Sequence, residues 1–105
     1  MEKETIITLQ KSFEEFAYKE EGIEFWFARD LQKLLGYDKW KNFLNAIDKA
    51  KEACKNSGHH IQDHFPEARK MVKLGSGSER QIEDYKLTRY ACYLIAQNGD
   101  PRKEQ

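Results

Sequence analysis

The sequence predicts an α+β domain with four main helices, a short strand and a basic β-hairpin around a helix-turn-helix-like core. Apolar residues recur at spacings of three and four in several segments, residues 23–27 are β-prone, and two further β-prone segments flank the Gly-Ser run 75–78. With 105 residues, 39% of them hydrophobic, the chain can bury one core without disulfides or metal. We therefore expect a single domain over residues 1–105.

The first 22 residues predict an acidic amphipathic helix. Apolar side chains recur at helical spacing over about residues 4–19, and Gly22 is expected to mark the end of the helix. These apolar positions are Ile6, Ile7, Leu9, Phe13, Phe16 and Ala17. Residues 23–27 are too few and too β-prone for a helix, so we expect one strand there whose aromatic residues anchor the core.

Two helices joined by a glycine turn resemble a helix-turn-helix. The first covers residues 28–35 and stops at Gly36; the second covers residues 39–56, with Asp38 as its expected N-cap. The second helix carries a clear apolar stripe: Trp40, Phe43, Leu44, Ile47, Ala50, Lys51 and Cys54. Gln32 and Asn42 depart from the usual pattern, and similar helix pairs occur in purely structural roles. Both interpretations stay open at this point.

The second half of the chain predicts a loop, a hairpin and a last helix. Residues 59–68 show no sustained period, so we expect a loop with one helical turn at most. Residues 69–74 and 80–87 indicate two strands joined through the flexible run 75–78. Thr88 is expected to cap a final helix, which the turn signals at residues 98–101 bring to an end.

The net charge is zero, yet the charges are unevenly distributed along the chain. Residues 1–24 hold seven acidic and three basic residues, a net charge of −4. Residues 25–55 hold seven basic and four acidic residues, and residues 69–105 hold eight basic and five acidic residues. Each of these two segments therefore has a net charge of +3. An acidic N-terminal segment followed by two basic segments indicates an electrostatic field that is oriented across the molecule. The alternative interpretation is that these charges simply lie on solvated helix faces.

Neither a catalytic site nor a metal centre is predicted. Cys54, His59, His60, Asp63 and His64 are metal-ligating residue types, but no paired Cys-x-x-Cys or His motif completes a zinc spacing. No nucleophile elbow, phosphate-binding loop or metalloprotease motif occurs, so we expect no enzyme and no cofactor. Cys54 and Cys92 lie in helical apolar patterns typical of buried, reduced thiols.

The chain carries no sign of a membrane span or of export. No apolar run approaches the roughly 18–20 residues that a membrane helix needs. The first residues, Met1-Glu2-Lys3-Glu4, lack the basic start and apolar stretch of a signal peptide. We therefore expect a cytoplasmic protein without membrane partners.

Long ordered segments resemble the N-terminal half of the DNA-damage-inducible protein D family. They are residues 26–31, 34–37, 50–59, 63–65, 71–76 and 89–101, within a matching core over 23–101. The first of them are also similar to the Bro-N domains of viral and phage antirepressor-type proteins, regarded as DNA-binding modules. The resemblance implies a bacterial, SOS-type role near DNA or its repair machinery, without cofactor or catalytic residues. It also implies that the chain is the N-terminal fragment of a longer protein.

These observations lead to a hypothetical DNA-binding site. Six cations are candidates for neutralising phosphates: Lys39, Lys41, Lys49, Lys70, Lys73 and Arg80. Asn42 and Asn45 are the exposed amides expected to contact base edges. The alternative is a protein-interaction module that modulates repair or recombination proteins through its charged faces, without contacting DNA. The oligomeric state is left open, with a homodimer among the alternatives.

Overall fold

The computed structural model of the protein describes residues 12–99, which form helices around a small antiparallel sheet. Residues 12–15 are helical and precede the first strand. The elements that follow are β1 (Tyr18–Glu20), β2 (Ile23–Phe27), α2 (Ala28–Leu34), α3 (Trp40–Asn56), α4 (Ile61–His64), β3 (Glu67–Lys73), β4 (Glu79–Leu87) and α5 (Arg89–Asn98). This is an α+β fold, as the sequence predicted.

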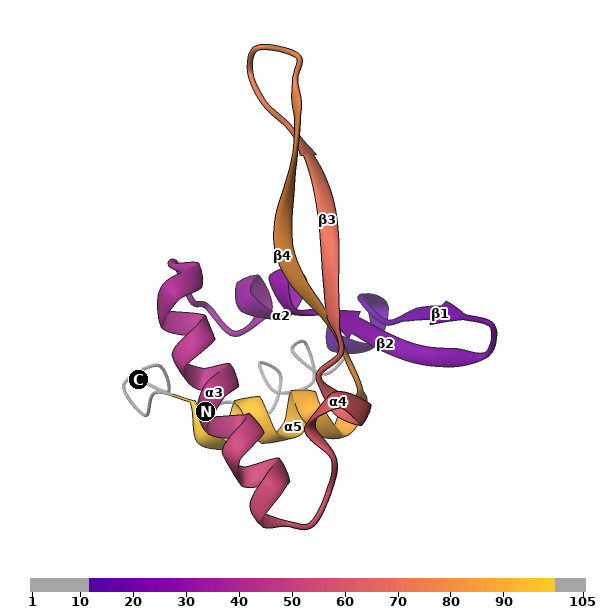
Figure 1. Ribbon diagram of the computed structural model, residues 1–105, viewed down its shortest axis with the longest axis vertical. Helices are drawn as coiled ribbons and strands as arrows, with labels where there is room; N and C mark the ends of the chain where they lie inside the picture. The colour runs from indigo at the N-terminus through magenta and orange to yellow at the C-terminus, as the bar shows by residue number, and fades with distance from the viewer. Residues whose placement is uncertain (1–11, 100–105) are drawn as a thin grey trace.

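The sheet is made of two hairpins that diverge from a short junction. Its strand order is β1-β2-β4-β3, with antiparallel pairing throughout. β2 and β4 pair at two positions, Trp26 with Leu87 and Phe27 with Lys86. Beyond this junction the hairpins separate, and Figure 1 shows the β3–β4 hairpin rising from the helices while the β1–β2 hairpin extends to the side.

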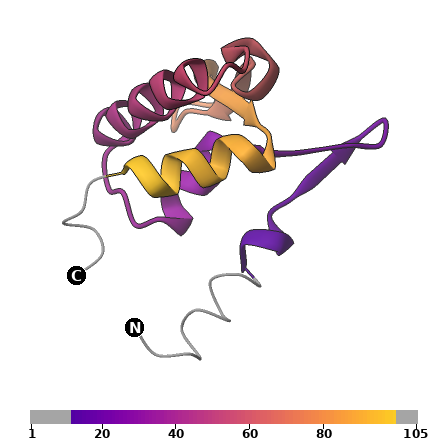
Figure 2. The ribbon, with the colours of Figure 1, turned by 90° about the horizontal axis from the view of Figure 1, so that it is seen from below.

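The core lies between one sheet face and the helices α3 and α5, which run side by side in Figure 2. Trp26 and Leu87 contribute from the sheet, Phe43 and Ile47 from α3, and Ile95 from α5; each side chain is fully buried. Burial of these large apolar side chains is the main favourable term in folding. Within residues 12–99, no helix is long and apolar enough to cross a membrane.

Most of the elements expected from the sequence are confirmed. The strand at residues 23–27, both middle helices and the long hairpin occur, with the hairpin strands shifted by a residue or two. The predicted α3 stripe is buried at Phe43, Ile47, Ala50 and Cys54. Thr88 caps α5, because its hydroxyl oxygen accepts a hydrogen bond from the backbone N–H of Ala91 at 3.1 Å.

The end of the first helix was wrongly placed. Residues 4–11 lie outside the described part of the chain, but the helix gives way before Tyr18–Glu20, which is a strand. Gly22 does not end a helix: Glu21 and Gly22, with φ of 54° and 81°, form the two-residue turn between β1 and β2. Positive φ at both turn residues matches the twist of a hairpin, so the turn sets this strand pairing.

Three finer expectations also change. The sequence indicated four main helices and one short strand beside the hairpin, whereas the described sheet has four strands and the number of main helices is not confirmed. The single turn α4 does lie within residues 59–68, where at most one helical turn was expected. Lys39, not Asp38, occupies the N-cap position of α3, and its side chain makes no capping hydrogen bond. The helix-turn-helix-like core is not confirmed, because α3 packs mainly against α5 and has few contacts with α2.

Candidate nucleic-acid interface

The distal part of the β3–β4 hairpin, residues 69–83, is a basic arm. It carries the four cations Arg69, Lys70, Lys73 and Arg80 and the two carboxylates Glu79 and Glu83, a net charge of +2. The arm stands clear of the helices in Figure 1. Its tip is closed by two backbone hydrogen bonds between Leu74 and the turn, from Leu74 N to Ser78 O at 2.7 Å and from Gly77 N to Leu74 O at 3.0 Å.

On one face of the arm the strand register places each cation opposite a carboxylate. Residues that face each other in an antiparallel pair lie on the same side of the sheet. Arg69 lies opposite Glu83, and Lys73 lies opposite Glu79. Opposite charges in such pairs attract, so this face of the arm is close to electrically neutral.

On the other face the cations lie opposite apolar or aliphatic positions. Lys70 lies opposite Ile82, and Arg80 lies opposite Val72. Among the described residues of β3 and β4, the carboxylate on this face is Asp84, which is fully buried. The positive charge of the arm is therefore concentrated on the face that carries Lys70 and Arg80.

This face continues onto the first hairpin as the outer face of the sheet, opposite to the core. Because Lys86 pairs with Phe27, the two side chains lie on the same side, away from Trp26 and Leu87. Lys70 Nζ lies 5.6 Å from the centre of the Phe27 ring, and Lys86 Nζ lies 5.1 Å from the centre of the Phe25 ring. The outer face thus joins cations of one hairpin to aromatic rings of the other.

Tyr18, Phe25 and Phe27 form an aromatic cluster on this outer face. The centres of the Tyr18 and Phe25 rings are 5.6 Å apart, those of Tyr18 and Phe27 are 4.9 Å apart, and those of Phe25 and Phe27 are 5.3 Å apart. Phe25 is 8% exposed although it does not belong to the main core cluster, while Tyr18 is 44% exposed. Lys86 also forms an ion pair with Glu20 at 3.2 Å beside the cluster.

The base of the arm is fixed to α2. The backbone N–H of Arg29, in the first turn of α2, donates to Oδ1 of Asp84 at 3.1 Å, and Nε of Arg29 donates to the carbonyl oxygen of Glu83 at 3.0 Å. The backbone N–H of Tyr85 donates to the same Oδ1 at 2.8 Å. Burial raises the pKa of Asp84, and these two hydrogen bonds and the nearby Lys70 and Arg29 oppose that rise.

The α3 candidates lie on a second, separate surface. Lys41, Asn42, Asn45 and Lys49 are exposed on the side of α3 opposite its buried stripe, and Lys39 is exposed just before the helix. Asp48 and Glu52 are exposed on the same helix. Figure 1 shows the distal arm pointing away from α3, so the two groups of candidates do not form one continuous surface.

The structure therefore divides the predicted site residues into groups and adds new ones. Lys70 and Arg80 share the outer face, whereas Lys73 lies on the opposite, charge-paired face. Tyr18, Phe27 and Lys86 were not among the site residues predicted from the sequence. The sequence did contain one signal for this aromatic surface: Phe25 and Phe27 are two residues apart in the predicted strand, and residues two apart share one face of a strand.

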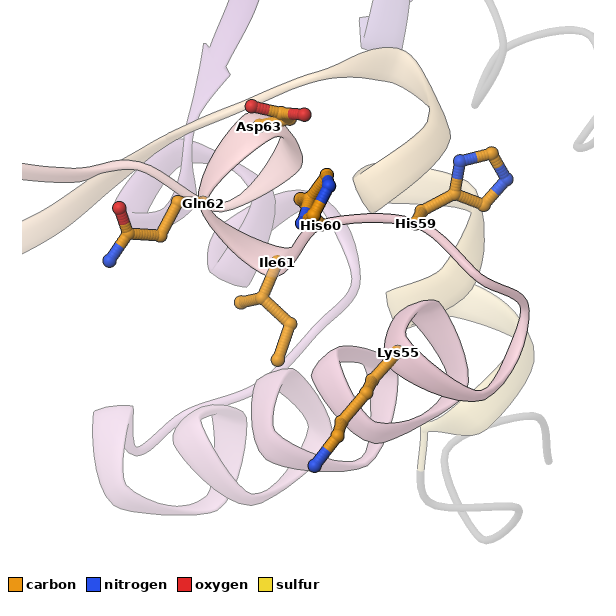
Figure 3. Close-up of a pocket in the computed structure, with 6 residues that line it drawn as sticks. All are labelled: Lys55, His59, His60, Ile61, Gln62 and Asp63. Carbon is orange, nitrogen blue, oxygen red and sulfur yellow. The ribbon is translucent and has the colours of Figure 1, made fainter.

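The histidine-rich segment has a structural role next to an open hollow. Figure 3 shows Lys55, His59, His60, Ile61, Gln62 and Asp63 lining this hollow beside α4. The rings of His59 and His64 both contact Tyr90, and His64 Nδ1 is hydrogen-bonded to Thr88 Oγ1 at 2.8 Å. In the described range 12–99, no three His, Cys, Asp or Glu residues are grouped so that they could hold a metal ion.

The fold and this surface define a small α+β module with a basic β-hairpin arm. The model of the BRO family, N-terminal domain, matches residues 15–105, and the chain belongs to this family. It is 56% identical over 82 residues to DNA damage-inducible protein D of Escherichia coli strain K12, which confirms the resemblance found in the sequence. The aligned part covers 78% of this chain but 30% of that relative. No solved structure matches significantly.

Proposed function

We propose that the chain is a non-catalytic DNA-binding module of a bacterial DNA-damage response. Two findings support this role: membership of the BRO family, N-terminal domain, and similarity to a protein named as DNA damage-inducible. The observation that carries the proposal is the outer face of the basic arm, where Lys70 and Arg80 have no carboxylate opposite them. Cations presented in this way bind phosphates without reading sequence.

The geometry of the arm suits a phosphate backbone. Lys70 and Arg80 are diagonal neighbours across the two strands, at about 7–8 Å between their Cα atoms. Their long side chains can reach two phosphates of one strand while the arm follows a groove. Lys86 lies further along the same face and extends the positive strip toward the sheet junction.

The exposed face of α3 is a second contact surface in this proposal. Lys39, Lys41 and Lys49 would hold phosphates and Asn42 and Asn45 would contact base edges. Because Asp48 and Glu52 are exposed on the same helix, we expect this face to contribute less affinity than the arm.

A salt titration of labelled DNA tests the proposal. We expect the protein to bind duplex and single-stranded oligonucleotides at low salt, with log K falling linearly as log salt rises, because phosphate contacts release counterions. Replacing Lys41 and Lys49 by glutamine should weaken binding less than replacing Lys70 and Arg80. Absence of binding to either form of DNA at low salt would reject the DNA-binding role for this chain.

A protein-interaction role is the second candidate, and the β1–β2 hairpin favours it. This hairpin carries Glu20, Glu21 and Glu24, and Ile23 near its tip is 67% exposed. An apolar residue among carboxylates fits a basic protein surface on a repair or recombination protein. Capture from the lysate of damaged cells that survives nuclease treatment, and is lost when Glu20 and Glu21 become glutamine, would support it. Capture that depends on DNA would exclude it.

A further inference from the structure

The aromatic cluster of Tyr18, Phe25 and Phe27 lies on the outer face of the sheet. The helices α3 and α5 cover the opposite, Trp26 face of the sheet. We propose that this cluster is a base-stacking subsite for single-stranded nucleic acid. The inference rests on the proposed DNA-binding function and adds to it a binding site that recognises unpaired bases.

The rings are arranged as a surface that a base can reach. Tyr18 lies on the edge strand β1 and is 44% exposed, and Phe27, whose ring centre is 4.9 Å from that of Tyr18, is partly exposed. Phe25 lies beneath them and supports both rings, at 5.6 Å from Tyr18 and 5.3 Å from Phe27 between ring centres. A flat ring that is held by its neighbours loses little conformational entropy when a base stacks on it.

The cations at the cluster are placed for the backbone of the same strand. Lys70 and Lys86 lie 5.6 Å and 5.1 Å from the Phe27 and Phe25 ring centres, and they come from β3 and β4 respectively. Aromatic rings interleaved with cations are the general pattern of single-strand binding surfaces, which stack bases and neutralise phosphates together.

The preference of the site for single-stranded over duplex nucleic acid follows from its shape. Bases in a duplex are stacked on one another, so their faces cannot lie against a protein ring unless they leave the helix. The arm can contact the phosphates of either form, whereas the cluster adds affinity for unpaired bases. Preference for single strands is therefore assigned to the cluster, and general affinity is assigned to the arm.

Glu20 limits the affinity of the proposed stacking site for single-stranded nucleic acid. Its carboxylate pairs with Lys86 at 3.2 Å; the Glu20 side chain is exposed and the Lys86 side chain is partly exposed, so a phosphate can replace the Glu20 carboxylate at little cost. Glu20→Gln would free Lys86 and remove a negative charge beside Tyr18. We expect this variant to bind single strands more tightly than the unmodified chain.

Three labelled probes test the proposal: an oligothymidylate, an abasic strand of equal length, and a duplex. The unmodified chain should bind the oligothymidylate more tightly than the abasic strand. Tyr18→Leu keeps an apolar side chain but removes the ring, so it should weaken oligothymidylate binding roughly tenfold, the change for one lost stacking contact. Its affinity for the abasic strand and for the duplex should stay the same.

Two further variants control for folding and for aromatic residues in general. Tyr18→Phe should bind the three probes like the unmodified chain. Tyr93→Leu removes a ring that is 54% exposed on α5, and it should leave the affinity for all three probes unchanged. Circular dichroism melting confirms that each variant is folded. Equal binding of the oligothymidylate and the abasic strand, or an equal loss for all three probes in Tyr18→Leu, overturns the stacking site. Duplex binding in the same series shows separately whether the arm binds DNA.

Discussion

Arg29 and Asp84 join two elements that are 55 residues apart in the sequence. The backbone N–H of Arg29 donates to Oδ1 of Asp84 at 3.1 Å, so a strand residue accepts a hydrogen bond from the first turn of α2. The N-cap residue of α2, Phe27, has no side-chain acceptor for this purpose. Asp84 therefore caps the N-terminus of α2 from a distant part of the chain, and this hydrogen bond fixes the arm to the rest of the domain.

This arrangement predicts an unusual dependence of stability on pH. Burial raises the pKa of Asp84 in the folded state above its ordinary value of 3.8, so the folded state holds its proton more tightly than the unfolded state does. The contribution of Asp84 to the free energy of unfolding is then greatest below that value and falls as pH rises through the folded pKa. Asp84→Asn keeps Oδ1 and should remove this fall.

Denaturant unfolding of both proteins across the acidic range measures the effect, with each free energy of unfolding plotted against pH. Identical slopes for the unmodified chain and Asp84→Asn would contradict the assignment. Asp84→Ala is the matched comparison, because it leaves two buried N–H groups without their acceptor and should cost about 1–3 kcal/mol.

Arg89 predicts a second change in stability. Its guanidinium group donates to Glu24 at 3.0 Å and to Glu14 at 3.0 Å, and it lies 5.0 Å from a ring of Trp26. Arg89→Lys keeps the charge but cannot make both paired contacts, so we expect a lower melting temperature for this variant. An unchanged melting temperature would mean that the ion pairs are replaced by water without loss.

Thr88 tests the capping of α5. Thr88→Ala removes the acceptor for the N–H of Ala91 and the partner of His64 Nδ1, and should lower the free energy of unfolding by about 1 kcal/mol. Thr88→Ser retains the hydroxyl group and should restore most of the stability. Denaturant titration distinguishes the two variants; equal loss in both would assign the effect to the methyl group.

The two cysteines predict resistance to thiol reagents. Cys54 and Cys92 are free and buried, and burial raises the pKa of Cys92 to about 12 and also raises that of Cys54. Since the thiolate is the reactive form, neither residue should be labelled in the native protein, and both should be labelled in denaturant. Mass spectrometry counts the labels, and rapid native labelling would contradict the buried placement.

Local pattern was enough to predict much of this fold. The α3 stripe, the β2 strand and the Thr88 cap depend on residues close together in the sequence. β1 was missed because Tyr18, Lys19 and Glu20 continue a helical pattern, while their strand conformation depends on the turn at Glu21–Gly22 and on pairing with β2. Tertiary pairing overrides local propensity in such short segments.

The candidate site was less predictable for the same reason. Lys70, Lys73 and Arg80 were visible as cations, but their distribution over two faces depends on the register, which pairs Lys73 with Glu79 and Arg80 with Val72. Likewise, Lys86 and Phe27 are 59 positions apart in the numbering and meet through the β2–β4 junction. Contacts between distant segments leave no periodic signal in a single sequence.

In the proposed function, one face of the arm binds DNA phosphates. Two double variants with the same change in charge test it: Lys70→Gln with Arg80→Gln on the outer face, and Arg69→Gln with Lys73→Gln on the charge-paired face. Fluorescence anisotropy with labelled duplex across a salt series gives the slope of log K against log salt. The outer-face variant should lower the magnitude of this slope by nearly 2, about 0.9 for each lost phosphate contact, and the paired-face variant should hardly change it. Equal effects of the two variants would contradict the claim.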